Sequence, residues 1–161
     1  GTATCSIQGD EGRVRGIELE GRITPIEGFS LIGAASRMDS EMTRSAPYKG
    51  KELAMVPEYS ASFWADYTFQ AGALQGLSLA AGARYNGVSY GDSANLYRIP
   101  SYTLFDAAIR YDVGQIGGTQ VQLALNASNL ADKRFVSTCT GVSSCYYGSG
   151  RTVMATARFG W

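Results

Sequence analysis

Three observations predict an all-β fold with antiparallel, up-and-down strands. Segments in which apolar and polar side chains alternate with a period of two recur along the chain, separated by turn-forming residues. Glycine and tyrosine are abundant, at 20 and 10 of 161 residues, whereas proline occurs 4 times, and this mixture suits strands and tight turns. No stretch shows a convincing helical period of 3.6 residues.

The first half of the chain contains three of the expected strands. Residues 12–24 (GRVRGIELEGRIT) alternate aliphatic residues with Glu and Arg. Residues 28–38 (GFSLIGAASRM) alternate less clearly, but they lie where an antiparallel sheet needs a strand. Residues 58–69 (EYSASFWADYTF) alternate aromatic residues and Ala with Ser, Asp and Thr.

The second half contains four more, so we expect about seven strands. Residues 77–87 (LSLAAGARYNG) and 103–113 (TLFDAAIRYDV) set Leu, Ala, Ile and aromatic residues against Ser, Arg and Asp. Residues 121–129 (VQLALNASN) follow the same rule. The last segment, 151–161 (RTVMATARFGW), alternates strictly and stops on an aromatic residue.

The connections between these segments alternate in length. Three are short and rich in glycine, namely TPIEG, QAGALQG and GQIGG. The others are long and polar with scattered aromatic residues, namely DSEMTRSAPYKGKELAMVP, VSYGDSANLYRIP and LADKRFVSTCTGVSSCYYGSG. Short turns at one end and long loops at the other are typical of a transmembrane β-barrel of the outer membrane.

The two faces of the strands also favour a membrane barrel over its main alternative, a soluble β-sandwich. The apolar face consists of Ala, Gly, Leu and aromatic residues rather than the Val and Ile of a core between sheets, and the other face carries Asp, Arg and Asn at mid-strand. We therefore expect the apolar face to contact lipid and the polar face to line a wet lumen. Aromatic residues gather near strand ends, as an interfacial girdle requires: Tyr67, Phe69, Tyr85, Tyr111, Phe159 and Trp161.

Composition excludes several classes of function. The chain has 14 basic and 14 acidic residues, so no charge excess points to nucleic acid. It has no histidine, which removes the usual catalytic triads and the commonest metal ligand. Of the cysteines, Cys139 and Cys145 are separated by the flexible TGVSS and are expected to form a disulfide in an oxidising compartment. The third cysteine, Cys5, is then left without a disulfide partner in this sequence, and we expect that partner upstream.

From GIELEG onward, the chain resembles the C-terminal part of TonB-dependent siderophore receptors. The matching blocks are GIELEG, VPEYSASFWADYTF, GARYNG, IPSYTLFDAAIRYD, NASNLADKRFVSTC and CYYGSGRTVMATARFGW, and they follow in family order over nearly the whole chain. The Cys139–Cys145 pair in the last long loop, followed by YYG and GR, is most similar to the ferric-hydroxamate receptors of the ferrichrome type.

The resemblance implies an architecture and a location. Members of the family have a barrel of about 22 strands closed by an N-terminal plug. Residues 1–161 would then be the last seven strands, and residues 1–10 the tail of an extracellular loop, with the plug and the segment that engages TonB absent. The location would be the bacterial outer membrane, where the partners are lipid, the TonB complex and a ferric siderophore, without nucleic acid. The last strand would carry Phe159 and Trp161 at the membrane interface, as an assembly signal.

The implied function is TonB-dependent uptake of ferric siderophores, which is not an enzymatic activity. It requires no cofactor, because the iron arrives already chelated. The fragment alone would not transport. The alternatives are an outer-membrane enzyme, such as a hydrolase or acyltransferase, and a small structural or adhesion barrel.

Aromatic residues of the long loops are the candidate ligand contacts, because they offer large contact areas at low entropic cost. The candidates are Tyr146, Tyr147, Tyr90, Tyr97 and Arg98. Each could instead belong to the girdle or pack loop against loop. Since Tyr146 and Tyr147 are neighbours, at most one is expected to face the ligand if the strand has resumed there.

Charged residues on the polar face are expected to pair in the lumen or with the plug, rather than to form a catalytic cluster. They are Asp66, Arg84, Asp106, Arg110, Asp112 and Arg158. In NASNLADKR we expect Asn129 and Asp132 to cap a turn.

Overall fold

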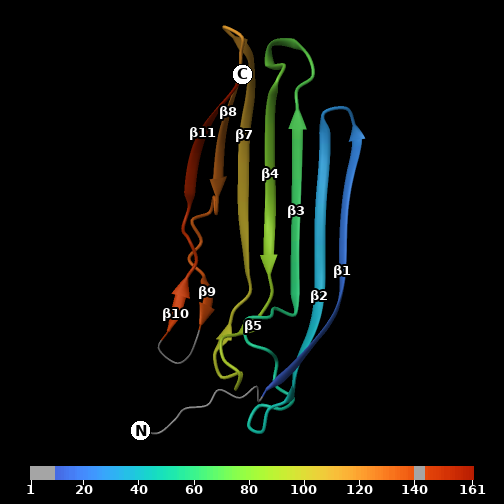
Figure 1. The fold of residues 1–161 in the computed structure, drawn as a ribbon, viewed down its shortest axis with the longest axis vertical. Helices are drawn as coiled ribbons and strands as arrows, with labels where there is room; N and C mark the ends of the chain where they lie inside the picture. The colour runs from blue at the N-terminus through green and yellow to red at the C-terminus, as the bar shows by residue number, and fades with distance from the viewer. Residues whose placement is uncertain (1–9, 140–143) are drawn as a thin grey trace.

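The computed structural model describes residues 10–139 and 144–161. Its main element is one antiparallel sheet of seven strands in the order β1-β2-β3-β4-β7-β8-β11, in which each strand pairs with its neighbours along the chain (Figure 1). The strands are β1 (Glu11–Ile26), β2 (Phe29–Arg44), β3 (Tyr59–Thr68), β4 (Leu77–Asn86), β7 (Tyr102–Ile116), β8 (Thr119–Ser128) and β11 (Thr152–Gly160). The seven expected strands and their up-and-down order are thus confirmed. Within the described residues the sheet does not close, and β1 and β11 are its edges.

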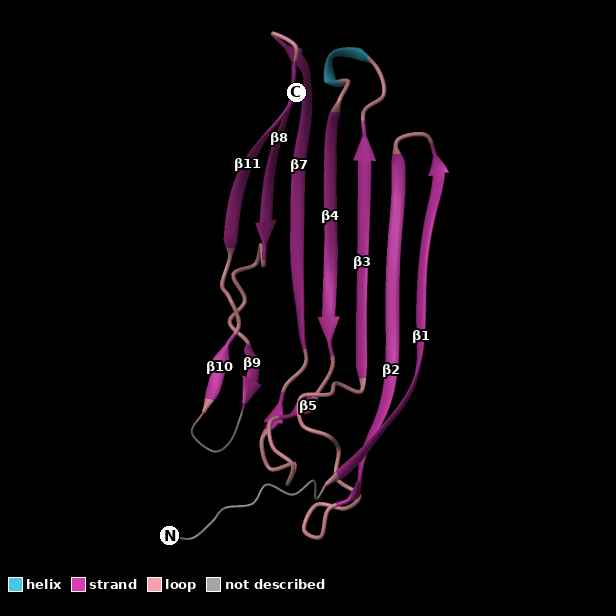
Figure 2. Ribbon diagram, viewed as in Figure 1, coloured by secondary structure: helices cyan, strands magenta, loops and turns pink. Residues whose placement is uncertain are grey.

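The connections differ at the two ends of the sheet, as expected. The short turns and the C-terminus lie together at one end, and the long connections lie at the other (Figure 1). The β3–β4 turn contains a short 3-10 helix, η1 (Gly72–Leu74), which Figure 2 shows in cyan. The β7–β8 turn is Gly117–Gly118, with φ of 60° and 87°, and two consecutive positive φ values are what the two-residue turns of tight hairpins require.

The long connections contain small hairpins that the alternation did not predict. The hairpin of β5 (Ser89–Tyr90) and β6 (Arg98–Ile99) lies between β4 and β7, and that of β9 (Val136–Cys139) and β10 (Cys145–Tyr147) lies between β8 and β11. β1 and β2 are also longer than expected, at 16 residues each, so the β2–β3 connection begins after Arg44.

One face of the sheet is apolar and the other polar. Most of the large apolar side chains that the strands expose have odd residue numbers, as Ile17 (77 % exposed) shows on β1. The cross-strand register aligns them, for example Leu31 with Ala65 and Ala65 with Ala81. The exposed apolar set of the strands includes Ile17, Leu19, Ile23, Phe63, Leu79, Phe105, Ile109, Leu123, Leu125, Val153 and Phe159.

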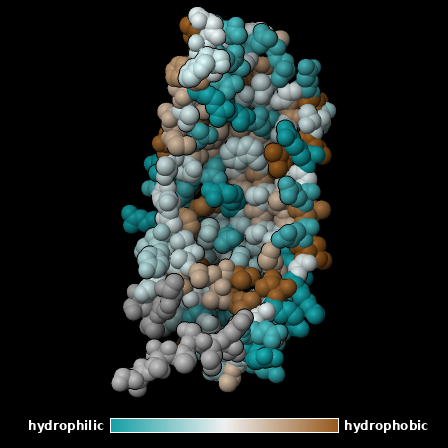
Figure 3. Space-filling model, in the orientation of Figure 1, coloured by the Kyte–Doolittle hydropathy of each residue, from teal (hydrophilic) through white to brown (hydrophobic). Residues whose placement is uncertain are grey.

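Even-numbered positions form the opposite face, where polar and small residues gather. Ser36 and Ser60 share a hydrogen bond of 2.7 Å there, and Thr68 and Ser78 share one of 2.8 Å. In the face seen in Figure 3, the middle consists mainly of hydrophilic residues and residues of intermediate hydropathy, and hydrophobic residues lie toward its margins. The small core includes Ala80, Leu104 and Ala108 of this polar face. The predicted division of the strands into an apolar and a polar face is therefore confirmed. We call the polar face the luminal face.

Aromatic side chains gather where the strands meet the turns. The rings of Tyr67 and Phe69 lie 5.0 Å apart edge to face, and those of Phe29 and Tyr67 lie 6.4 Å apart. Tyr111 and Phe159 are exposed on the apolar face near the same end. This arrangement matches an aromatic girdle at a membrane interface.

Candidate functional site

The long connections contact one another and form a loop cluster, which comprises residues 45–58, 87–101 and 129–139 with 144–151. The backbone N–H of Met55 donates to the carbonyl of Tyr90 at 2.7 Å. Asn95 fixes the same two loops more firmly. Its side-chain oxygen accepts from the N–H of Glu52 at 2.8 Å, and its amide nitrogen donates to the carbonyl of Glu52 at 2.9 Å. The first two loops are therefore joined by one bond between backbone groups and by two bonds from the Asn95 side chain to the backbone of Glu52.

The β9–β10 hairpin is the third part of the loop cluster. Cys139 and Cys145 face each other across it and form a disulfide, as the sequence predicted. Gly91 of the second loop packs against Cys139 so closely that a Cβ at position 91 would collide with it. The hydroxyl of Thr138 donates to the sulfur of Met55 at 2.6 Å. The hairpin is thus held by both other loops.

The candidate ligand residues lie on two parts of the loop cluster. Tyr146 and Tyr147 are on β10 and are 58 % and 76 % exposed, with a register irregularity between them. Tyr90 and Tyr97 are half-buried in the second loop, whereas Arg98 is exposed. The hairpin therefore presents aromatic surface to solvent. The backbone of Tyr97 forms hydrogen bonds within the second loop, and the carbonyl of Tyr90 accepts the bond from the first loop.

Asn129 ties the two ends of this hairpin together. It is 2 % exposed and has a φ of 52°, a left-handed conformation that asparagine tolerates well. Its side-chain oxygen accepts from the N–H of Lys133 at 2.9 Å, and its amide nitrogen donates to the carbonyls of Lys133 at 2.9 Å and Ser149 at 3.1 Å. Asp132 accepts from the N–H of Arg151 at 2.8 Å. The prediction of a turn-capping side chain is confirmed for Asn129, whereas Asp132 closes the turn through its backbone N–H, which donates to the carbonyl of Asn129 at 2.8 Å, and its side chain bonds Arg151 instead.

Two ion pairs cross the luminal face. Arg84 donates to both carboxylate oxygens of Asp106, at 2.6 and 3.0 Å, which is the bidentate geometry that makes such pairs strong. Arg110 of β7 pairs with Asp66 of β3, so this pair spans β4 between them. Four of the six charges predicted to line the lumen therefore pair with each other.

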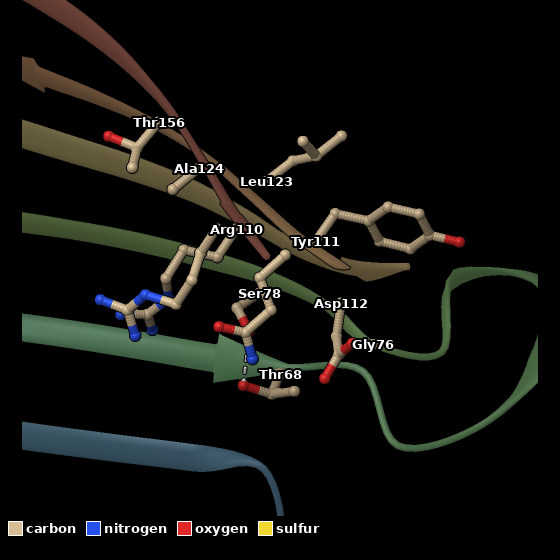
Figure 4. A pocket seen from close by; sticks show the side chains of 11 residues that line it. Thr68, Gly76, Ser78, Arg110, Tyr111, Asp112, Leu123, Ala124 and Thr156 are labelled. Carbon is tan, nitrogen blue, oxygen red and sulfur yellow. Dashed lines mark hydrogen bonds between the residues drawn. The ribbon is translucent and has the colours of Figure 1, made fainter. Parts of the chain in front are cut away.

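The other two charges lie toward the turn end. Asp112 accepts from the side-chain amide of Gln120 at 2.6 Å. Arg158 lines a hollow of about 350 Å³ that also includes Arg110, Asp112 and Thr156 (Figure 4). This hollow is open, mixed in polarity and remote from the loop cluster, so it does not bring the predicted ligand residues together.

Neither a metal site nor a membrane-spanning helix is found in residues 10–139 and 144–161. No group of three or more His, Cys, Asp or Glu residues could hold a metal ion there. No helix in this part of the chain has the length and hydropathy needed to cross a membrane.

The family model described as "TonB dependent receptor-like, beta-barrel" matches residues 1–130. The chain belongs to this family. Members of the TonB-dependent receptor family are β-barrel proteins of the outer membrane.

Individual relatives are siderophore receptors. The chain is 42 % identical over 154 residues to the "Ferrichrome outer membrane transporter/phage receptor" of Escherichia coli, covering 96 % of this chain and 21 % of that protein. It is 37 % identical over 142 residues to the "Ferrioxamine B receptor" of Salmonella typhimurium, covering 87 % and 20 %. The chain thus spans about a fifth of the length of these curated relatives. The named relatives are receptors and transporters, not enzymes.

Solved structures of this receptor family have the same fold. The siderophore receptor PiuA from Acinetobacter baumannii superimposes with a TM-score of 0.75 at 30 % identity, over 93 % of this chain and 22 % of that one. BauA, the ferric preacinetobactin receptor of the same organism, gives a TM-score of 0.82 at 26 % identity, over 95 % and 23 %.

Sequence reasoning missed the contacts that hold the loop cluster together. Met55 and Asn95 gave no signal, because their roles depend on loops that meet only in the folded chain. The link from Asp106 to Asn129 was also missed, although each residue was singled out separately. Cys5 lies outside the described residues.

Proposed function

We propose that this chain is the C-terminal part of a barrel that recognises ferric siderophores of the hydroxamate type and takes them up with energy delivered through TonB. The observation that carries the proposal is the disulfide-braced hairpin with its exposed Tyr146 and Tyr147, in a chain related to the ferrichrome and ferrioxamine B receptors. No relative named here favours an enzyme or an adhesion barrel.

The aromatic side chains would bind the outside of the iron chelate. A siderophore surrounds its iron, so the protein needs contact area and hydrogen bonds rather than metal ligands. Tyr146 and Tyr147 offer such area on a hairpin that the Cys139–Cys145 disulfide and Gly91 hold in place. Ordering the hairpin before the ligand arrives reduces the entropic cost of binding. Arg98, exposed on β6, would attract anionic or carbonyl groups of the chelate.

Transport would require more than these residues. The sheet has unpaired edges at β1 and β11, which a membrane barrel cannot leave open in lipid. We infer that further strands, a plug and the TonB-engaging segment belong to the same receptor, with residues 1–161 supplying its last seven strands. Phe159 and Trp161 would then mark the membrane interface and the assembly signal of the final strand.

The test is a binding titration with the intact receptor that contains this chain. Ferrichrome and ferrioxamine B are added while intrinsic fluorescence quenching is recorded. Replacing Tyr146 and Tyr147 together by Ala is expected to weaken binding roughly tenfold to a hundredfold, since loss of a good aromatic contact costs about 1–3 kcal/mol. Tyr85→Ala is the control, because Tyr85 lies on the lipid face. Failure of the intact receptor to bind any ferric siderophore would refute the proposal.

A further inference from the structure

The structure assigns to Asp106, acting through Asn129, the positioning of the disulfide hairpin: a carboxylate on the luminal face fixes the surface that presents Tyr146 and Tyr147. The ligand side of this inference rests on the function proposed above. The structural side stands on contacts within the chain.

The first step is the position of Asp106. It lies on β7, and its side chain is 13 % exposed. It accepts three hydrogen bonds, two from Arg84 and one from the backbone N–H of Asn129 at 3.0 Å. The oxygen Oδ1 takes part in both contacts, so the arginine that holds the carboxylate also sets the position of its bond to Asn129.

The second step runs from Asn129 into the hairpin. Because Asn129 is almost completely buried, loss of Asp106 would remove the partner of a buried backbone N–H, which costs free energy. The adjacent Leu130 N–H donates to the carbonyl of Phe105 at 2.8 Å, so the chain is held to β7 at two successive residues. From this fixed point the Asn129 side chain bonds Lys133, which precedes β9, and Ser149, which follows β10.

The third step is the short distance along the chain between the base of the hairpin and the tyrosines. We call Lys133 and Ser149, which the Asn129 side chain bonds, the root of the hairpin. Ser149 is two residues from Tyr147, and Gly148 between them donates its N–H to the carbonyl of Phe135 at 2.9 Å. The ring of Phe135 lies 4.3 Å from that of Tyr102, at the start of β7. A shift of the root therefore moves the segment that carries both tyrosines, and Asp106 controls that root from the lumen.

The chain contains a matched control for this role. Asp66 is also a luminal carboxylate, 18 % exposed in its side chain, and it also pairs with an arginine. The contacts described for Asp66 do not reach the hairpin. Asp66→Ala and Asp106→Ala thus each remove a carboxylate and leave one arginine without its partner. Only Asp106→Ala also removes the acceptor of the Asn129 N–H.

The experiment compares amide hydrogen exchange in the intact receptor and these two variants. In Asp106→Ala we expect exchange in Val136–Cys139 and Cys145–Tyr147 to become roughly tenfold to a hundredfold faster, because a bond to a charged group is lost. In Asp66→Ala the same amides are expected to stay within about twofold of the parent. Equal acceleration in both variants, or none in Asp106→Ala, would overturn the inference.

Two further variants keep the test decisive. Asp106→Asn retains an oxygen for the Asn129 N–H and is expected to restore slow exchange; exchange as fast as in Asp106→Ala would overturn the route through Asn129. If Asp106→Ala does not fold, Asn129→Gly replaces it, since glycine accepts the φ of 52° but lacks the side-chain bonds. Unchanged exchange in Asn129→Gly would also overturn the inference.

Binding separates this inference from the proposed function. Titration of the same variants with ferrichrome is expected to rank their affinities in the order of their exchange rates. A parent receptor that binds no ferric siderophore would refute the proposed function, while the exchange comparison would still decide whether Asp106 positions the hairpin.

Discussion

A single arginine introduced on either face of the sheet tests which face contacts lipid. Ala81 is the fifth of ten residues on β4, on the apolar face, with Ala65 and Ala107 directly opposite it on the neighbouring strands. Ala34 lies on the luminal face of β2, opposite Glu20 and Ser62. The same substitution, Ala→Arg, therefore enters an apolar surface at one position and lies opposite a carboxylate at the other.

The expected magnitudes differ widely. In the assembled barrel, Ala81→Arg places a guanidinium among small apolar side chains near mid-strand, where an arginine on the lipid face costs about 2–4 kcal/mol. That cost corresponds to roughly 30-fold to several-hundred-fold in the unfolding equilibrium constant. Ala34→Arg gains a partner in Glu20, and an exposed pair of this kind changes stability by about 1 kcal/mol or less.

The assay is urea unfolding of the intact receptor in lipid vesicles, followed by tryptophan fluorescence and by the mobility of the folded barrel on unheated gels. We expect the midpoint to fall strongly for Ala81→Arg and to stay near the parent value for Ala34→Arg. Equal losses, or a larger loss for Ala34→Arg, would refute the assignment of the two faces.

Three more perturbations test the disulfide, the packing of the luminal face and the end of the last strand. Peptide mapping of unreduced receptor is expected to recover Cys139 and Cys145 in linked peptides, and reduction to cost about 2 kcal/mol, since the closed loop is short; two free thiols in oxidised material would contradict this. Gly82→Ala is expected to displace the indole of Trp64, which lies against Gly82 on the luminal face, and so to shift tryptophan emission; an unchanged spectrum would contradict the packing. Deletion of Trp161 is expected to reduce the amount of heat-modifiable barrel in isolated outer membranes, and normal assembly would contradict a role in the interface.

The strands and their faces could be predicted because apolar and polar residues alternate with a period of two along the sequence. Where small residues interrupt that period, as in the run Gly33-Ala34-Ala35-Ser36 of β2, the signal was weak although the strand is 16 residues long. There the strand is set by its partners, β1 and β3, whose own patterns are clear.

The small hairpins and the loop contacts could not be predicted in the same way. β5 and β6 have two residues each, too few to show a period, and they pair with each other within the β4–β7 connection. Asn129 was recognisable as a turn residue from its neighbours in sequence, but its bond to Asp106 joins residues 23 positions apart. Only the pairing of β7 with β8 brings these two residues together.

Because the three loops of the loop cluster contact one another, they restrict which segments can be exchanged between related receptors. At the turn end, Gly117–Gly118 closes its hairpin with local residues, so that turn could be exchanged between relatives as an independent module. At the other end, a graft of the disulfide hairpin alone would lose Met55 and Gly91, on which it rests. A chimaera built to transfer ligand preference would therefore have to carry all three loops at once, and gradual divergence in one loop would require compensating change in the others.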